Sequence, residues 1–489
     1  MNYIDQCEQE KLHLSGKIQP HGALIITSRE GVIKHLSSNV NALLETSPEL
    51  SIGDTLPPSL LNTLNLFGDT CLKQNYQTYH TPHQQRFDVT VSRQETTLCL
   101  EFTAFIDDSP HKPDYFELPA DLGDKSERNL ILSHLLQWIQ TLTGHERVIY
   151  YHFMDNGDGQ VVNEVCIDPD MGSYLDLRFP ASDIPQIART LYCQNPWREI
   201  PAADKAPLLV LGTDVSSDLT YTDLRSVSPI HRQYMANMGI NSSISFPLIK
   251  QGDLDALISC HSRHSRKLPL RILRKITRVV SEFNLLQREL DSRNRQELID
   301  EFSRNTHPIQ TLLNSDKTLP IIWPELSNQL AHHFKADGTV LCGDGWALVS
   351  GITPNKDTLE HLDDWFTNTA NERIFWSDNV SGLIPDLPLT EVSGISGIRF
   401  QPKGAKIFSD YRLYLCRSEH IHEVSWGGNP NKPEESLHSD DPISPRFSFE
   451  KWIEKRLGYS RPWPNTIDIQ LHQFRRLLES WKINIGEQP

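Results

Sequence analysis

Alternating apolar and polar residues near the N-terminus predict a small antiparallel sheet. The segment GALIITS (22–28) has the composition of a buried strand, and a polar turn separates it from the next apolar segment. The predicted strands are residues 22–28, 32–37, 86–93 and 96–105, with a short helix at 39–45. The segment DDSPHKPDYFELP (107–119) holds three prolines and clustered polar residues, which predicts a linker after this sheet.

A second unit with mixed helices and strands is predicted after the linker. It opens with an amphipathic helix over about 126–143, and a helical stretch follows Pro185. Its predicted strands lie near 147–153 and 161–165 and within SSISFPLI (242–249) and DALISCH (255–261). This order favours a sheet with helices packed on it.

Two apolar stripes have the 4-3-4-3-4 spacing of a heptad. The first consists of Ile272, Ile276, Val279, Phe283, Leu286 and Leu290, on a helix that continues towards Phe302. The second consists of Ile467, Leu471, Phe474, Leu478, Trp481 and Ile485. Each stripe could be buried against its own domain, or the two could pair across a parallel dimer and carry a signal lengthwise. We expect the dimer, because one stripe lies at a domain junction and the other at the chain end.

A third mixed unit is predicted over 305–489. It contains a polar excursion at 425–452 with four prolines, and excursions of this length are often functional. The fold class predicted is α+β, with three tandem domains at 1–118, 119–304 and 305–489.

Composition and charge argue against several classes of function. The chain has 489 residues, of which 38% are apolar and 22% charged, and no apolar run approaches the roughly 18 residues that span a bilayer. The acidic, polar N-terminus does not resemble a signal peptide, so we expect a cytoplasmic protein. The net charge of −16 argues against nucleic acid or anionic membrane as a partner.

The cysteines indicate reduced thiols. Eight are scattered without a CxxC pair, and most lie in apolar strand-like segments, which favours neither a disulfide framework nor a metal site. Cys7 differs, because it lies in a polar segment ahead of the first predicted strand.

Three motifs combine with Cys7. They are LHLSGKIQPHGALI (12–25), RFPASDIP (178–185) and LRSVSPIHRQYMANMGI (224–240), and WGG (426–428) and PRFSF (445–449) follow them. In this order the set resembles the photosensory core of a bacterial phytochrome. The resemblance implies PAS, GAF and PHY domains around a bilin, with long connecting helices and a PHY tongue hairpin at about 420–455.

The resemblance accounts for Cys7. Bacterial phytochromes attach biliverdin through a thioether to a cysteine just ahead of the PAS domain, and Cys7 occupies that position. Plant and cyanobacterial relatives carry a cysteine just before the histidine that matches His231, where this chain has Ile230. The implied cofactor is therefore biliverdin IXα, bound at Cys7.

The same resemblance implies the remaining contacts of the cofactor. Arg198 and Arg225 match the family's ligands of one propionate, and Ser243 and Ser245 match its donors to the other. Guanidinium groups suit carboxylates. Asp183 provides an acceptor and a negative charge for a cationic bilin, and its other possible role is to cap the helix after Pro185. The other implied contacts are Ile18, Tyr151, Ile184, Pro185, Tyr192, His231, Tyr234 and His261.

A switch is implied in the polar excursion. Arg446 and Ser448 of PRFSF match the tongue residues that exchange places at the GAF aspartate, here Asp183, and Trp426 belongs to the same set. No kinase, cyclase or P-loop signature is present. We also expect a homodimer through GAF and PHY helices, and an output domain beyond Pro489, because the C-terminal heptads run to the end of the chain.

Two other functions stay open. A colourless sensor could bind a small ligand in the GAF domain, and a cysteine-dependent enzyme could use Cys260 of CHSRH (260–264). The segment DNGDG (155–159) lacks the further ligands of a calcium loop and is interpreted as a hairpin turn.

Overall fold

The computed structural model describes most of the chain, in two compact units. The described residues are 11–65, 73–94, 96–107, 115–212, 217–368, 372–384, 391–403, 410–430 and 449–484. One unit comprises 1–290 with 425–452, and the other comprises 291–424 with 453–489. Cys7, Arg446, Ser448 and Ile485 lie outside the described residues. Within those ranges, no helix is both long and apolar enough to cross a membrane.

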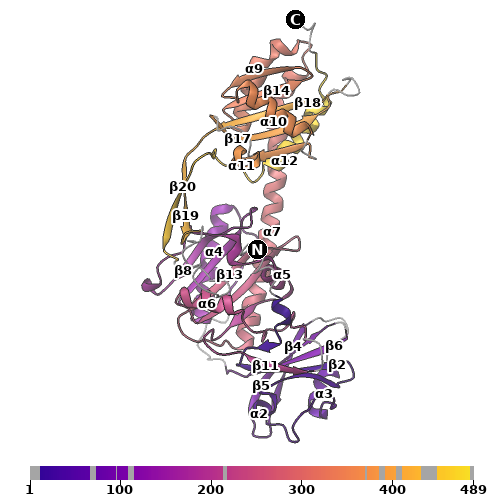
Figure 1. Cartoon of the computed structure of the whole chain (residues 1–489), viewed down its shortest axis with the longest axis vertical. Coiled ribbons are helices and arrows are strands. Elements are labelled where there is room, and N and C mark those ends of the chain that lie inside the picture. The colour runs from indigo at the N-terminus through magenta and orange to yellow at the C-terminus, as the bar shows by residue number, and fades with distance from the viewer. Residues whose placement is uncertain are drawn as a thin grey trace, which may run out of the picture. The chain divides into compact units, whose positions relative to one another are not determined.

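The first sheet has seven strands and contains all four strands predicted for it (Figure 1). In spatial order these are β1 Lys17–Ile18, β11 Leu208–Gly212, β3 Ile33–Ser37, β2 Gly22–Ser28, β6 Thr97–Ala104, β5 Arg86–Arg93 and β4 Lys73–His80. The accompanying helices are η1 Leu12–Leu14, α2 Val40–Leu44 and α3 Pro58–Asn65. Apolar residues that alternate along β2, β5 and β6 form its core with residues of α2 and α3.

One strand of this sheet comes from a distant part of the chain. β11 lies between β1 and β3, with Leu209 paired to Lys17 and Val210 paired to Ser37. The sequence pattern does not predict this pairing, since alternation indicates a strand but not its partner. The first sheet is therefore completed by a segment of the second domain.

The second sheet has eight strands. In spatial order they are β10 Arg198–Ile200, β12 Ser242–Lys250, β13 Asp253–Ser262, β7 Arg147–Phe153, β8 Gly159–Cys166, β9 Arg178–Phe179, β19 His422–Gly427 and β20 Lys451–Arg456. Its helices are α4 Lys125–Thr143, η2 Pro169–Met171, η3 Ala181–Asp183, α5 Gln186–Gln194, α6 Pro229–Asn237 and α7 Leu270–Asn305. Helix α4 begins at a capping box between Asp124 and Glu127 and ends at Gly144, which has a φ of 66°.

The first apolar stripe is buried within its own domain. Ile272, Ile276 and Phe283 of α7 are at most 1% exposed and pack with α4, β12 and β13 in one core. Leu290 belongs to the same core, and Leu286 is partly buried against it. The expectation that this stripe pairs across a dimer is wrong, because its side chains already fill a core.

The third sheet has five strands and belongs to the second compact unit. In spatial order its strands are β15 Trp346–Gly351, β14 Gly338–Gly343, β18 Tyr411–Ser418, β17 Val392–Phe400 and β16 Ile374–Ser377. Its helices are α8 His307–Leu313, α9 Leu319–Phe334, α10 Lys356–Asn368, α11 Val380–Leu383 and α12 Ile467–Ser480.

The second apolar stripe is also buried within its own domain. Ile467, Leu471, Phe474 and Leu478 of α12 pack with α9, β17 and β18. The helix ends at Ser480, and Trp481 is extended, with its side chain in the same core. The dimer seam expected from this stripe is therefore wrong as well, since a helix packed on a sheet shows the same spacing.

Truncation of Leu471 tests this burial. Leu471 is 0% exposed, so Leu471→Ala should lower the free energy of unfolding by about 2–5 kcal/mol. Arg476→Ala, at an exposed position of the same helix, should change it by less than about 0.5 kcal/mol. Chemical denaturation followed by circular dichroism measures both. Unfolding that is unchanged in Leu471→Ala, together with a loss of dimer in solution, would restore the dimer seam.

Candidate functional site

A cavity lies in the second domain, between its sheet and the segments that carry the sequence motifs. β7, β12 and β13 supply one wall, and α5, α6 and the connections around residues 182–185 and 222–228 supply the others. The residues predicted from the motifs that line it are Tyr151, Asp183, Ile184, Pro185, Tyr192, Arg198, Arg225, His231, Tyr234, Ser243, Ser245 and His261. The fold thus brings together residues that are up to 110 positions apart.

Arg189 fixes the wall that carries Asp183. Its Nε donates to the carbonyl of Ile184 (2.7 Å), and its Nη2 donates to the carbonyls of Gly157 (2.7 Å) and Ala181 (3.1 Å). The carboxylate of Asp158 accepts from the backbone N–H of Ala181 (3.0 Å). The DNGDG segment is the turn between β7 and β8, as predicted, and it also holds this wall in place.

Asp183 forms a hydrogen bond across the cavity. The hydroxyl of Tyr234, on α6, donates to its carboxylate (2.9 Å). The ring of Tyr234 also stacks with that of His231, with centroids 6.0 Å apart and planes 13° from parallel. The other role considered for Asp183 is wrong, because Pro185 occupies the N-cap of α5 and the cap has no side-chain hydrogen bond.

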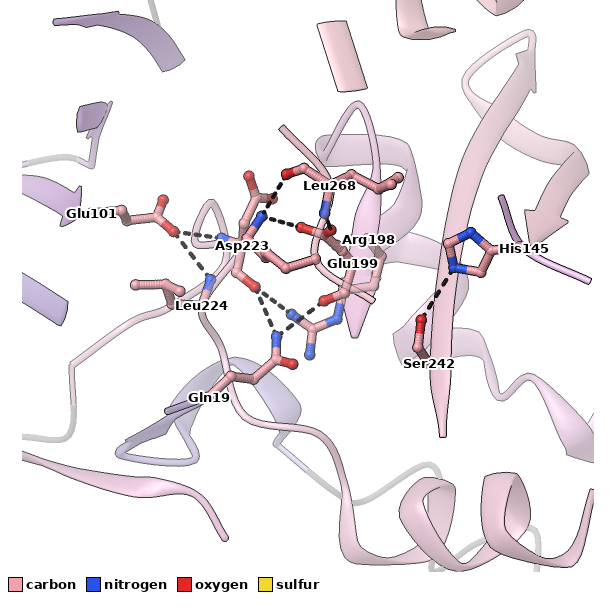
Figure 2. Close-up of polar contacts among 10 residues, drawn as sticks. Gln19, Glu101, His145, Arg198, Glu199, Asp223, Leu224, Ser242 and Leu268 are labelled. Atoms are coloured by element: carbon pink, nitrogen blue, oxygen red, sulfur yellow. Dashed lines mark hydrogen bonds and ion pairs between the residues drawn. The ribbon is translucent and has the colours of Figure 1, made fainter. Parts of the chain in front are cut away.

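Two neighbouring arginines place positive charge in the cavity wall. Arg198 donates to the carbonyls of Asp223 (2.9 Å) and Arg225 (2.7 Å), as Figure 2 shows for the first of these. Arg225 is buried and donates to the carbonyls of Leu219 (3.4 Å) and Thr220 (3.3 Å). Burial, with the charge of Arg198 second, lowers the pKa of Arg225 to about 9. A ligand anion would stabilise both charges.

Both predicted histidines are neutral at pH 7. His261 is 8% exposed, and burial lowers its pKa to about 3, with smaller contributions from Arg147, His145 and His231. His231 lines the cavity with an exposed ring, and desolvation by the surrounding protein and then the charge of Arg198 lower its pKa. Nδ1 of His261 is buried and has no hydrogen-bond partner among the described residues.

Aromatic side chains enclose one side of the cavity. The ring of Tyr151 packs against Phe153 (centroids 5.2 Å apart) and Phe179 (6.0 Å). It also lies so close to Gly159 of β8 that a Cβ there would clash with it. The lack of a side chain at residue 159 therefore allows Tyr151 to occupy its place in the wall.

The cavity has further walls that the sequence analysis missed. They include Leu12, Tyr174, Phe179, Asn195, Trp197, Asp223, Met235, Met238 and Ser259. Leu12, Phe179, Met235 and Met238 lie inside the quoted motifs, so their position was a usable signal. Leu12 shows that the N-terminal segment reaches the cavity five residues after Cys7.

Two residues singled out from the sequence lie away from the cavity. Ile18 is fully buried in a cluster with Leu24, Ile26 and Leu224 and is not part of the cavity lining. Cys260 is fully buried in the core that contains α4 and α7, and burial raises the pKa of its thiol. A reactive thiolate at Cys260 is therefore strongly disfavoured.

Both described ends of the polar excursion contact the motif segments. Trp426 is 4% exposed and pairs in parallel with Arg178. A Cβ at Gly427 would lie 2.6 Å from the ring of Phe179, so glycine permits this approach. The ring of Phe449 meets Tyr234 edge to face, with centroids 5.0 Å apart. A contact path thus joins Phe449, Tyr234 and Asp183.

Comparisons with known proteins agree along the whole chain. The PAS fold family matches residues 7–105, the GAF domain family 127–283 and the phytochrome region family 294–479. The chain is 30% identical to cyanobacterial phytochrome B of Nostoc sp., over 99% of this chain and 66% of that protein. It is 29% identical to a bacteriophytochrome of Pseudomonas aeruginosa, over 97% and 66%. The chain therefore spans just under two thirds of the length of these relatives.

Solved structures are similar over nearly the same extent. The photosensory core module of a Stigmatella aurantiaca phytochrome has a TM-score of 0.81 and 27% identity, and covers 96% of this chain and 97% of its own. A bacteriophytochrome of R. palustris has a TM-score of 0.77 and 26% identity, over 97% and 98%.

The buried histidine generates a prediction about pH. The pKa of His261 is lower in the folded protein than in the unfolded chain, so its stability contribution is present above pH 6.5 and is lost as pH falls towards 3. Between pH 6.5 and 5 the ligand-free protein should lose up to about 1.4 kcal/mol per pH unit through this group.

Thermal unfolding of ligand-free protein at pH 7.5 and pH 5 measures this loss. His261→Gln should reduce the difference in melting temperature between the two pH values, whereas His80→Gln, at an exposed histidine, should leave it unchanged. An equal difference in wild type and His261→Gln would contradict the assignment.

Proposed function

Because the chain belongs to the phytochrome family, with the PAS, GAF and PHY domains of a bacteriophytochrome photosensory core, we propose that it is a red/far-red light photoreceptor module that binds biliverdin IXα covalently. We assign the PAS domain with its N-terminal segment to 1–118, the GAF domain to 119–304 and the PHY domain to 305–489. The observation that carries the proposal is the convergence of the motif residues on one cavity. Biliverdin, when bound, supplies light absorption and a double bond that isomerises.

The residues of the cavity fit such a ligand. Arg198 and Arg225 would hold one propionate, and Ser243 and Ser245, which lie on β12 in the cavity wall, would hold the other. His261, which lines the cavity and is neutral, would hydrogen-bond a ring carbonyl. Tyr151, Tyr192 and Tyr234 would confine the ring that rotates, and Asp183 would supply the acceptor near the ring nitrogens.

Residues next to the cavity would also transmit the isomerisation of the bound ligand to the tongue. Asp183 is held by Tyr234, and Tyr234 contacts Phe449 of PRFSF. A shift of the Tyr234 ring would therefore displace Phe449 of the tongue directly. We propose that Arg446 and Ser448, three and one positions before Phe449, exchange places at Asp183 as the tongue changes between hairpin and helix. Trp426 would anchor the other end of the tongue through its pairing with Arg178.

The signal would pass to a C-terminal output domain in a homodimer. The buried stripes of α7 and α12 cannot form the dimer interface. Leu130 of α4 and Leu285 of α7 are 59% and 61% exposed, and they would supply apolar contacts between two GAF domains.

Covalent attachment is tested by mixing purified protein with biliverdin. A zinc-stained denaturing gel should show coloured wild type, and Cys7→Ser should lose the covalent band but retain reversible binding, since the cavity residues still hold the ligand. Cys166→Ser, at a half-buried cysteine outside the cavity lining, is the matched control and should attach normally.

Two outcomes contradict the proposal. Attachment that survives in Cys7→Ser would move the thioether to another cysteine. A wild type that takes up no biliverdin, covalently or reversibly, would favour the colourless small-ligand sensor.

The role of Asp183 is tested by Asp183→Ala. The pigment should still bind, because the arginines and Cys7 are unchanged, but red illumination should fail to give complete far-red absorbing product. Absorption spectra before and after illumination measure this, with Asp204→Ala at an exposed GAF position as the control. A normal product in Asp183→Ala would refute the role.

A further inference from the structure

A buried carboxylate of the first domain faces the cavity's arginine segment. Along β6, Leu98, Leu100 and Phe102 point into the core of the first sheet, so Cys99 and Glu101 lie on the opposite face. That face also carries Leu24 and Ile26, which pack with Leu219 and Leu224 of the second domain. Glu101 is 2% exposed and thus lies in the contact between the two domains.

The carboxylate of Glu101 binds two consecutive backbone N–H groups. Its Oε2 accepts from Asp223 (2.8 Å) and from Leu224 (3.1 Å), as Figure 2 shows. A buried carboxylate that accepts such bonds is costly to remove, because the N–H groups would be left unsatisfied. The peptide units around residues 223 and 224 are therefore held by the first domain.

Gln19 holds the same segment from the N-terminal side. Its Nε2 donates to the carbonyls of Glu199 and Asp223 (both 3.1 Å), and its backbone N–H donates to the carbonyl of Leu224 (2.7 Å). The N–H and the carbonyl of residue 223 are thus bound from different segments of the chain. This fixes the position and orientation of the segment.

The segment in turn positions both arginines. The carbonyl of Asp223 accepts a hydrogen bond from Arg198. Arg225 lies two residues later in the same segment, and its carbonyl also accepts from Arg198. A displacement of residues 223 and 224 would move the acceptor of one guanidinium and the backbone of the other. The charge of Glu101 also counteracts the lowering of the pKa of Arg198 and Arg225 by burial.

We propose that Glu101, a PAS residue outside the cavity, is the positioning residue that directs Arg198 and Arg225 of the GAF domain towards ligand carboxylates. The inference rests on the proposed function, since it takes those carboxylates to be the propionates of biliverdin. Through this one side chain, the PAS domain would favour ligands that carry free carboxylates.

The test compares biliverdin with its dimethyl ester, in which both carboxylates are masked. Dissociation constants are measured by absorption titration in a Cys7→Ser background, where binding is reversible. Glu101→Ala should weaken binding of the acid by about tenfold or more and change binding of the ester by less than about twofold. Preference for the acid should therefore fall. In the double variant Glu101→Ala/Arg225→Ala, the dissociation constant for the acid should rise by much less than the product of the two single fold-changes.

The controls separate positioning from general destabilisation. Thr90→Ala changes the buried neighbour that pairs with Glu101 on β5, and it should leave the preference for the acid unchanged. Glu101→Gln keeps an acceptor oxygen without the charge and should fall between wild type and Glu101→Ala. If circular dichroism shows that Glu101→Ala is unfolded, Glu101→Gln takes its place in the test.

The outcomes distinguish the inference from the function on which it rests. Equal weakening of acid and ester in folded Glu101→Ala or Glu101→Gln, or an unchanged preference, would overturn the positioning role and leave the photoreceptor intact. A parent protein that binds neither compound would overturn the bilin function, and the inference with it.

Discussion

The placement of two guanidinium groups side by side, with Arg225 buried and Arg198 half-buried, is the constraint on which the site depends. Arg198 and Arg225 repel each other, and burial disfavours their charged forms. Backbone carbonyls of residues 219, 220, 223, 225 and 226 accept their hydrogen bonds, so a single irregular segment must be held with all of these oxygens turned towards them. Glu101 and Gln19 bind the backbone N–H groups and carbonyls of residues 223 and 224 in this segment. The contact between the two domains thus holds the segment whose carbonyls bind both guanidinium groups.

Local patterns predicted local structure well. Alternation located β2, β3, β5 and β6, and the capping residues agree with the helix predicted at 126–143. The motif residues could be assigned to one site because each motif places several polar side chains close together in the chain. Ile18 does not follow this logic, because its side chain fills a buried cluster with Leu24 and Leu224 and does not line the cavity.

Long-range relations could not be predicted in the same way. The heptad spacing of α12 describes a helical face but not what covers it, and here the covering surface is the domain's own sheet. The contact of Glu101 with residues 223 and 224 could not be predicted, since a single acid in an apolar strand does not reveal its partners. Its role depends on a contact between residues 122 positions apart.

The insertion of β11 between β1 and β3 has a consequence for synthesis of the chain. Ser37 of β3 pairs with Val210, so β3 has an unpaired edge until the ribosome has added at least 173 further residues (210 − 37). At a typical 5–20 residues per second, this interval lasts roughly 10 to 35 s. An open strand edge invites pairing with other chains. The edge of β3 in the nascent PAS sheet is therefore open to such pairing until the GAF segment closes it.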